Sequence, residues 1–169
     1  MSERKVSGKL VHGLWGRALA GELPGGLLST LASKGLDPTQ VHREVSWTLF
    51  HQGVVETAEA LFPGRPDQLE RLGARVVECL RHEIPGAVLT VGKMMGVRSV
   101  LKRAVGQPLR GIEWLTLHLD ERGKRELAIT VNEPVATGFL AGALGALFKV
   151  FGERPTVAVE RPGCVAVRW

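Results

Sequence analysis

The 169-residue sequence predicts an α+β fold, in which N-terminal helices are followed by a hairpin-helix-hairpin unit that forms a four-stranded antiparallel sheet. In the first two thirds, apolar residues recur every three or four positions, as on amphipathic helices. Two later segments alternate in polarity, as strands do, and an apolar segment rich in glycine and alanine lies between them. The length suits one domain, 1–169, with a helical part at 1–108 and a β-β-α-β-β part at 109–169.

The first third of the chain is glycine-rich and predicts two short helices. In "KLVHGLWGRAL", Leu10, Leu14 and Leu19 lie near helical spacing. The second helix lies in "LPGGLLSTLASKG", with Pro24 near its start and Gly35 as its C-terminal cap.

Three longer helices follow. The first carries an apolar stripe that begins at Trp47 and stops before "FPGRP". Asp67 is suited to cap the second helix, which Pro85 terminates. The third is predicted to run without interruption from Ala87 to Val105.

Two β-hairpins are predicted in the last third. Polarity alternates through residues 112–131, with "DERGK" as the turn, and again through 156–169, where Pro162 and Gly163 form the turn. In "CVAVRW" the terminal Trp169 shares a face with the two valines. We therefore expect Trp169 to lie on the core side of the sheet.

The segment "GFLAGALGALFKVFG", residues 138–152, predicts a helix that packs closely against another element, because glycine and alanine let backbones approach. We expect that element to be the protein's own sheet. Packing against a second subunit is the alternative, since small residues four apart also suit helix pairing. The segment is short and contains Lys149, so a membrane span is not expected.

Composition excludes several classes of protein. With 44% hydrophobic and 23% charged residues, the chain predicts a packed core rather than disorder. The 22 basic and 17 acidic residues give a net charge of +5, but the basic residues are scattered without interleaved aromatics, so no nucleic-acid partner is expected. Cys79 and Cys164 are far apart, which favours two reduced thiols over a disulfide or zinc site. No leader precedes Lys9, so we expect a cytoplasmic protein.

Five segments carry a resemblance that spans most of the chain: "GLDP" (35–38), "ALFPG" (60–64), "LERLGARVVE" (69–78), "NEPVATGFLAGAL" (132–144) and "CVAVRW" (164–169). With them the chain resembles an expanded family of single-domain proteins found in myxobacteria. The order of its elements also resembles the superfamily of haem-nitric-oxide-binding sensors, 4-vinyl reductase domains and TRAPP transport subunits. This resemblance implies a domain that binds a small molecule between helices and sheet, or one that dimerises through its helices.

The same resemblance raises the question of cofactors. Nitric-oxide sensors use an axial histidine and a Tyr-x-Ser-x-Arg motif that binds the haem propionates. This chain has no tyrosine, and His82 is the only helical histidine suited to the axial role. TRAPP subunits carry an acyl chain on a helix cysteine, a place that Cys79 could take, although a plain core thiol is the simpler interpretation. The cysteine cluster with which related sensors bind zinc is missing, so we expect no cofactor and no metal.

No motif predicts an enzyme. "SVLK", residues 99–102, matches the Ser-x-x-Lys of acyl enzymes, but the motifs that accompany it there are absent. "RHE", residues 81–83, lacks the second histidine of a zinc-hydrolase helix. Glu113 and Asp120 lie seven residues apart on one expected strand, so they face opposite sides and cannot form a carboxylate pair.

Two hypotheses of function follow. The first is a non-enzymatic regulatory or sensory module that holds a small apolar ligand between helices and sheet. Its candidate pocket residues, which at helical spacing are also typical of a plain core, are Trp47, Phe50, Cys79, Met94, Met95, Trp114 and Phe139. The second is a ligand-free interaction module, a homodimer or adaptor. Its candidate interface residues, expected to be exposed, are Leu14, Trp15, Leu27 and Leu28.

Overall fold

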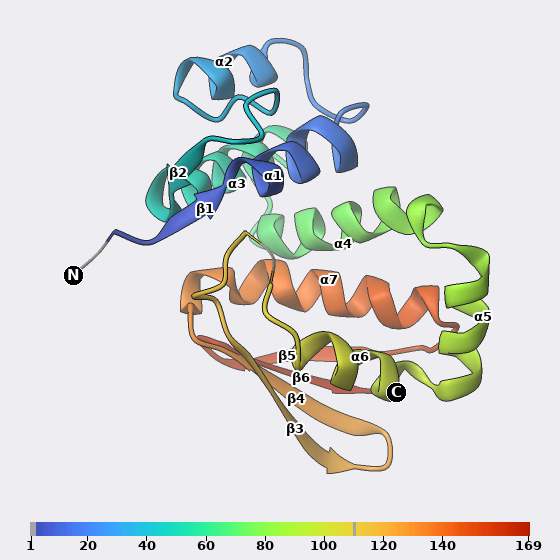
Figure 1. The fold of residues 1–169 in the computed structure, drawn as a ribbon. Coiled ribbons are helices and arrows are strands. Elements are labelled where there is room, and N and C mark those ends of the chain that lie inside the picture. Colours follow the sequence, from blue (N-terminus) through green and yellow to red (C-terminus); the bar gives the residue numbers. More distant parts are fainter. Residues whose placement is uncertain (1–2, 110) are drawn as a thin grey trace.

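The computed structural model describes residues 3–109 and 111–169. Figure 1 shows a group of N-terminal elements at the top, two long helices below it, and a β-sheet at the bottom. The top group contains a short antiparallel pair of strands and four helical segments. These elements are β1 (Lys5–Ser7), α1 (Gly8–Val11), the π-helix η1 (His12–Ala18), α2 (Leu27–Ser33), β2 (Glu44–Ser46) and α3 (Trp47–Leu61).

The N-terminal group has its own core, centred on Trp15, whose side chain is completely buried. The Trp15 indole N–H donates to the Thr57 hydroxyl at 2.9 Å, so its one polar group is satisfied. Ser46 begins α3 as an N-cap, because its hydroxyl accepts from the Leu49 N–H at 3.2 Å. The predicted apolar stripe of this helix faces the same core, through Phe50, Val54 and Ala58.

The middle of the chain departs from the sequence prediction at one point. It forms α4 (Gln68–Leu80), the 3-10 turn η2 (Arg81–Glu83), α5 (Gly86–Met95) and α6 (Val97–Val105). The uninterrupted helix expected over 87–105 is wrong, because Gly96 has φ +80°, a left-handed conformation that ends α5 before α6 begins.

The predicted four-stranded antiparallel sheet is confirmed. Its strands lie in the order β3-β4-β6-β5, so the two central strands come from different hairpins. The elements of this part are β3 (Leu117–Gly123), β4 (Glu126–Val131), the 3-10 turn η3 (Pro134–Ala136), α7 (Thr137–Val150), β5 (Thr156–Arg161) and β6 (Cys164–Arg168).

The first hairpin begins later than predicted. Residues 112–116 are not a strand, because the side chain of Trp114 turns toward the N-terminal group, where its N–H donates to the Lys5 carbonyl at 2.7 Å. The Asn132 side chain holds the same segment: its amide donates to the Trp114 carbonyl, and its carbonyl accepts from the Thr116 N–H.

Helix α7 packs on the sheet, as the sequence predicted, and forms a second core with it (Figure 1). Phe148 of α7 is fully buried there, and Trp169 packs edge-on against it with ring centroids 4.9 Å apart. No helix within the described residues is long and apolar enough to cross a membrane.

The opposite face of α7 packs on α4, and here small residues let the two helix backbones come close together. A Cβ added at Gly142 would lie 1.7 Å from the Glu70 carbonyl oxygen, and one at Gly73 would lie 2.0 Å from the Phe139 carbonyl oxygen. Gly145, in contrast, faces only the Val157 side chain at an ordinary 3.5 Å. The glycines therefore bring α7 close to α4 rather than, as expected, close to the sheet.

Candidate functional site

The seven predicted pocket residues do not line one cavity. Three of them form an aromatic cluster in the N-terminal core, where the Trp47 ring lies 5.8 Å from Phe50 and 5.1 Å from Trp114. Phe139 packs against the same core from α7. Cys79 is half-buried on α4, where burial raises the pKa of its thiol. None of these residues lines either of the clefts described below.

The two methionines line neither of these clefts. Met94 is 82% exposed and Met95 42% exposed, both on the outer face of α5. The expectation that they line a pocket is wrong, because α5 packs inward through its other face, where Gly92 meets the Phe151 ring.

The expected exposure of the interface residues is only partly correct. Leu14 and Trp15 are buried in the N-terminal core, so for them it is wrong. Both side chains lie on η1 and face the N-terminal core, where Trp15 contacts Phe50 and Thr57 of α3. Leu27 is half-buried and Leu28 is exposed, both on α2.

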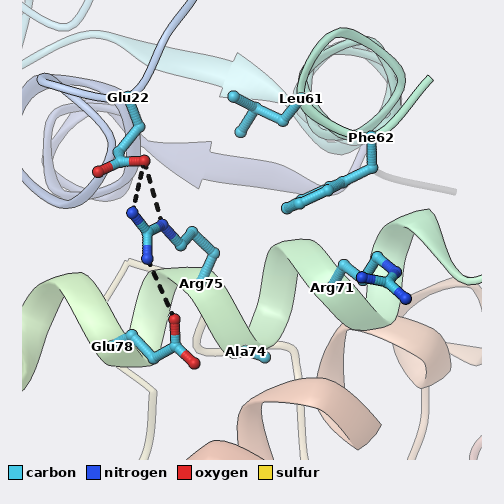
Figure 2. Close-up of a pocket in the computed structure, with 7 residues that line it drawn as sticks. All are labelled: Glu22, Leu61, Phe62, Arg71, Ala74, Arg75 and Glu78. Carbon is cyan, nitrogen blue, oxygen red and sulfur yellow. Dashed lines mark hydrogen bonds and ion pairs between the residues drawn. The ribbon is translucent and has the colours of Figure 1, made fainter.

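A cleft of about 430 Å³ lies between the end of α3 and helix α4. Figure 2 shows Leu61 and Phe62 at the end of α3, above α4, and Arg75 rising from α4 to meet Glu22 of the loop between η1 and α2. We name it the α3–α4 cleft; its lining residues are Glu22, Leu61, Phe62, Arg71, Ala74, Arg75 and Glu78.

Ion pairs organise the charged side of this cleft. The Nε and Nη2 atoms of Arg75 donate to Glu22 Oε2 at 3.1 and 2.8 Å, and its Nη1 donates to Glu78 Oε2 at 3.3 Å (Figure 2). These hydrogen bonds, first those to Glu22, raise the pKa of Arg75. One helical turn earlier, the Arg71 Nε donates to Asp67 Oδ2 at 2.9 Å and holds the pKa of Asp67 below its usual value.

A second cleft, of about 290 Å³, lies on the other side of α4 and is also lined by α7 and the start of β5. Helix α7 contributes mostly small residues to this lining, among them Gly142 and Gly145. Arg71 and Ala74 line both clefts. Helix α4 therefore separates two surface clefts, one toward the N-terminal group and one toward the sheet.

The α3–α4 cleft combines an apolar wall with charged side chains of both signs, two guanidinium groups and two carboxylates. Such a lining is suited to bind a ligand that has an apolar part and a charged part. Sequence reasoning missed Arg71 and Arg75. Their spacing of four residues in "RLGAR" places both on one helix face, and this was the available signal.

Comparison with known proteins places the fold among H-NOX domains. An oxygen-binding H-NOX domain related to soluble guanylate cyclases, solved as its oxygen complex, has a TM-score of 0.66 at 13% identity, covering 96% of this chain and 94% of its own. A structure from work on haem redox potential and porphyrin distortion has a TM-score of 0.64 at 15% identity, covering 96% and 99%. An Fe(II) unliganded H-NOX mutant from K. algicida has a TM-score of 0.59 at 11% identity, covering 95% and 94%.

The sequence match is more specific. Residues 4–169 match the family described as "Protein of unknown function (DUF2378)", and the chain belongs to that family. No curated protein matches the sequence.

The residues present do not fit haem, the cofactor that the H-NOX likeness raises. Haem needs an apolar cavity with a protein ligand aimed at the iron, yet neither cleft is lined by a histidine. His82, the expected axial candidate, is exposed on η2. The His12 ring is engaged with the Pro38 carbonyl at 2.9 Å. His51 packs against the Trp47 ring and lines neither cleft, although its buried Nε2 has no hydrogen-bond partner among the described residues. The likeness of this chain to H-NOX domains therefore concerns the fold.

Proposed function

We propose that this protein is a non-enzymatic sensory module that binds a small, partly apolar ligand in the α3–α4 cleft. The cleft itself carries this proposal: its volume of about 430 Å³ lies within the range of about 300–1,000 Å³ that is typical of small-molecule sites. The oxygen-binding H-NOX domain supports the proposal by analogy, since it is a ligand-binding protein with a similar fold.

The position of the cleft also suits a sensor. Helix α4 forms one wall of the cleft and contacts α7 on its other side, where Gly73 and Gly142 bring the two backbones together. Because these contacts involve backbone atoms, a ligand that displaces α4 also has to displace α7. Helix α7 lies on the sheet, so a movement of α7 would shift the sheet, and the sheet would pass the movement to a partner.

Native mass spectrometry of protein purified from its own host tests this proposal. Ala74 is half-buried between the two clefts, so Ala74→Phe should fill ligand space, whereas Ala104→Phe adds the same ring on an exposed face of α6. We expect a non-covalent adduct in the wild type and in Ala104→Phe, and its loss in Ala74→Phe. A wild-type protein that carries no adduct would argue against the proposal.

A second candidate is an adaptor that binds a protein partner through α5. Val88, Val91 and Met94 are exposed together on one face of this helix, more apolar surface than solvent contact favours. Neither α5 nor α6 contains an acidic residue, and Lys93 and Arg103 are exposed. This charge disfavours a second copy of the same face and fits an apolar groove rimmed by carboxylates.

Light scattering across dilution, combined with affinity capture, distinguishes these outcomes. An adaptor should remain monomeric and should lose its captured partner in Met94→Glu but not in the control Val159→Glu, an exposed position on β5. A dimer that dissociates on dilution and is disrupted by Met94→Glu would assign the face to self-association instead.

A further inference from the structure

The contacts of Arg75 suggest which chemical class of ligand the α3–α4 cleft accepts. Two nitrogens of its guanidinium already hold one carboxylate oxygen, that of Glu22, 53 positions away in the sequence. Both partners remain accessible from the cleft, with side-chain exposures of 41% for Arg75 and 35% for Glu22. The guanidinium thus presents a fork that binds carboxylates, currently occupied by a carboxylate from the protein itself.

The Glu22 carboxylate has no hydrogen-bond partner other than Arg75 among the described residues. It lies in an exposed loop, "AGELPGG" (20–26), which is rich in glycine, and a Cβ added at Gly21, Gly25 or Gly26 would meet no atom within 4 Å. An ion pair exposed to this degree contributes little to stability. A competing carboxylate can therefore replace Glu22 without disturbing a core.

The rest of the cleft adds two requirements. Leu61 and Phe62 form an apolar wall opposite α4, so a ligand anchored at Arg75 would lay a hydrocarbon portion against them (Figure 2). Arg71, one turn away, uses its Nε for Asp67, while its two Nη atoms form no hydrogen bond to a described residue and can receive a second oxygen.

We propose that the cleft binds an organic carboxylate with an apolar tail, which displaces Glu22 from Arg75 and so releases the loop 20–26 from α4. This inference rests on the proposed ligand-binding function and names the ligand class. It also provides a signal, because the ion pair that ties the loop 20–26 to α4 opens when the ligand is bound. The pair between Arg17 and Glu83, which ties η1 to η2 outside the cleft, remains closed.

Calorimetric titration with decanoate, using the full chain, tests the inference. We expect Arg75→Gln to weaken binding by at least about tenfold, since it removes a charge-assisted pair of hydrogen bonds. Glu22→Gln should strengthen binding by about threefold, because it removes the carboxylate that competes for two nitrogens of Arg75, while Glu78 keeps the third. Arg17→Gln, which breaks the other ion pair, should bind like the wild type and serves as the control. Melting curves establish that each variant is folded.

Decanol and decyl phosphate separate the contributions of tail and charge. Decanol, with the same tail but no charge, should bind at least about tenfold more weakly than decanoate. Equal binding of decanol and decanoate, tighter binding of decyl phosphate, or no gain in Glu22→Gln would overturn the carboxylate assignment. In those cases an adduct that depends on Ala74 in native mass spectra would still support a ligand site. Absence of both binding and adduct would overturn the site as well.

Discussion

Replacing Gly142 by alanine should destabilise the protein, although alanine is the better helix former. The added Cβ would lie 1.7 Å from the Glu70 carbonyl oxygen, and the contact would have to lengthen to at least 3.0 Å. A backbone oxygen cannot rotate away as a side chain can, so α4 and α7 would have to separate. Overpacking typically costs about 1–3 kcal/mol, and a clash with a rigid backbone atom belongs at the upper end, about 3 kcal/mol, against about 1 kcal/mol gained from helix propensity.

We therefore expect the free energy of unfolding to fall by about 2 kcal/mol, a decrease of about 4–8 °C in melting temperature for a chain of this size. Gly145→Ala, three residues further along α7, is the matched control. Its Cβ meets only Val157 at an ordinary 3.5 Å, so the melting temperature should rise by about 2–4 °C. Urea unfolding and calorimetry measure both. A Gly142→Ala protein as stable as Gly145→Ala would refute the close packing of α4 on α7.

Three further predictions concern the two cores and a surface turn. Deletion of Val167–Trp169 should lower the melting temperature by about 5 °C or more, because burial of a large aromatic stabilises the last strand; an unchanged melting curve would show that this strand is peripheral. Trp15→Phe should cost about 2–4 kcal/mol in urea unfolding, since it leaves a cavity and removes the hydrogen bond to Thr57, and a loss below about 1 kcal/mol would contradict this. Hydrogen bonds from Thr39 hold the pKa of Asp37 below its ordinary value. The resulting stability is present above about pH 4 and is lost as the pH falls through the folded-state pKa. Thr39→Val should therefore have a lower melting temperature than the wild type at pH 6, and the difference should shrink in acid.

Regular periodicity made most elements predictable. The apolar stripe of α3 and the alternation at the start of β3 each reflect burial of one face, which the order of residues records directly. The prediction failed where a contact with a distant part of the chain decided the local structure. Residues 112–116 alternate in polarity as a strand does, but Trp114 hydrogen-bonds to the Lys5 carbonyl and the segment leaves the sheet.

The candidate site was mostly hidden from sequence reasoning. Large apolar residues were expected to line a pocket, and the structure places them in the cores or, for Met94 and Met95, on the surface. The pairing of Arg75 with Glu22 joins a helix to a loop 53 positions away. The local pattern of neither segment indicates that the two side chains meet.

The sequence by itself determined the order of the longer helices and the four-stranded antiparallel sheet, because these depend on periodicity and turn residues within short segments. The short pair of strands β1 and β2 and the break between α5 and α6 were not predicted. The sequence also indicated that residues 138–152 pack closely against a neighbour, since the small side chains of Gly and Ala let another backbone approach the helix. The tertiary structure decided which neighbour the glycines serve: Gly142 faces the α4 backbone, while the sheet meets larger side chains. The tertiary structure also decided the clefts on both sides of α4, because the spacing of packed helices depends on contacts between residues far apart in the chain.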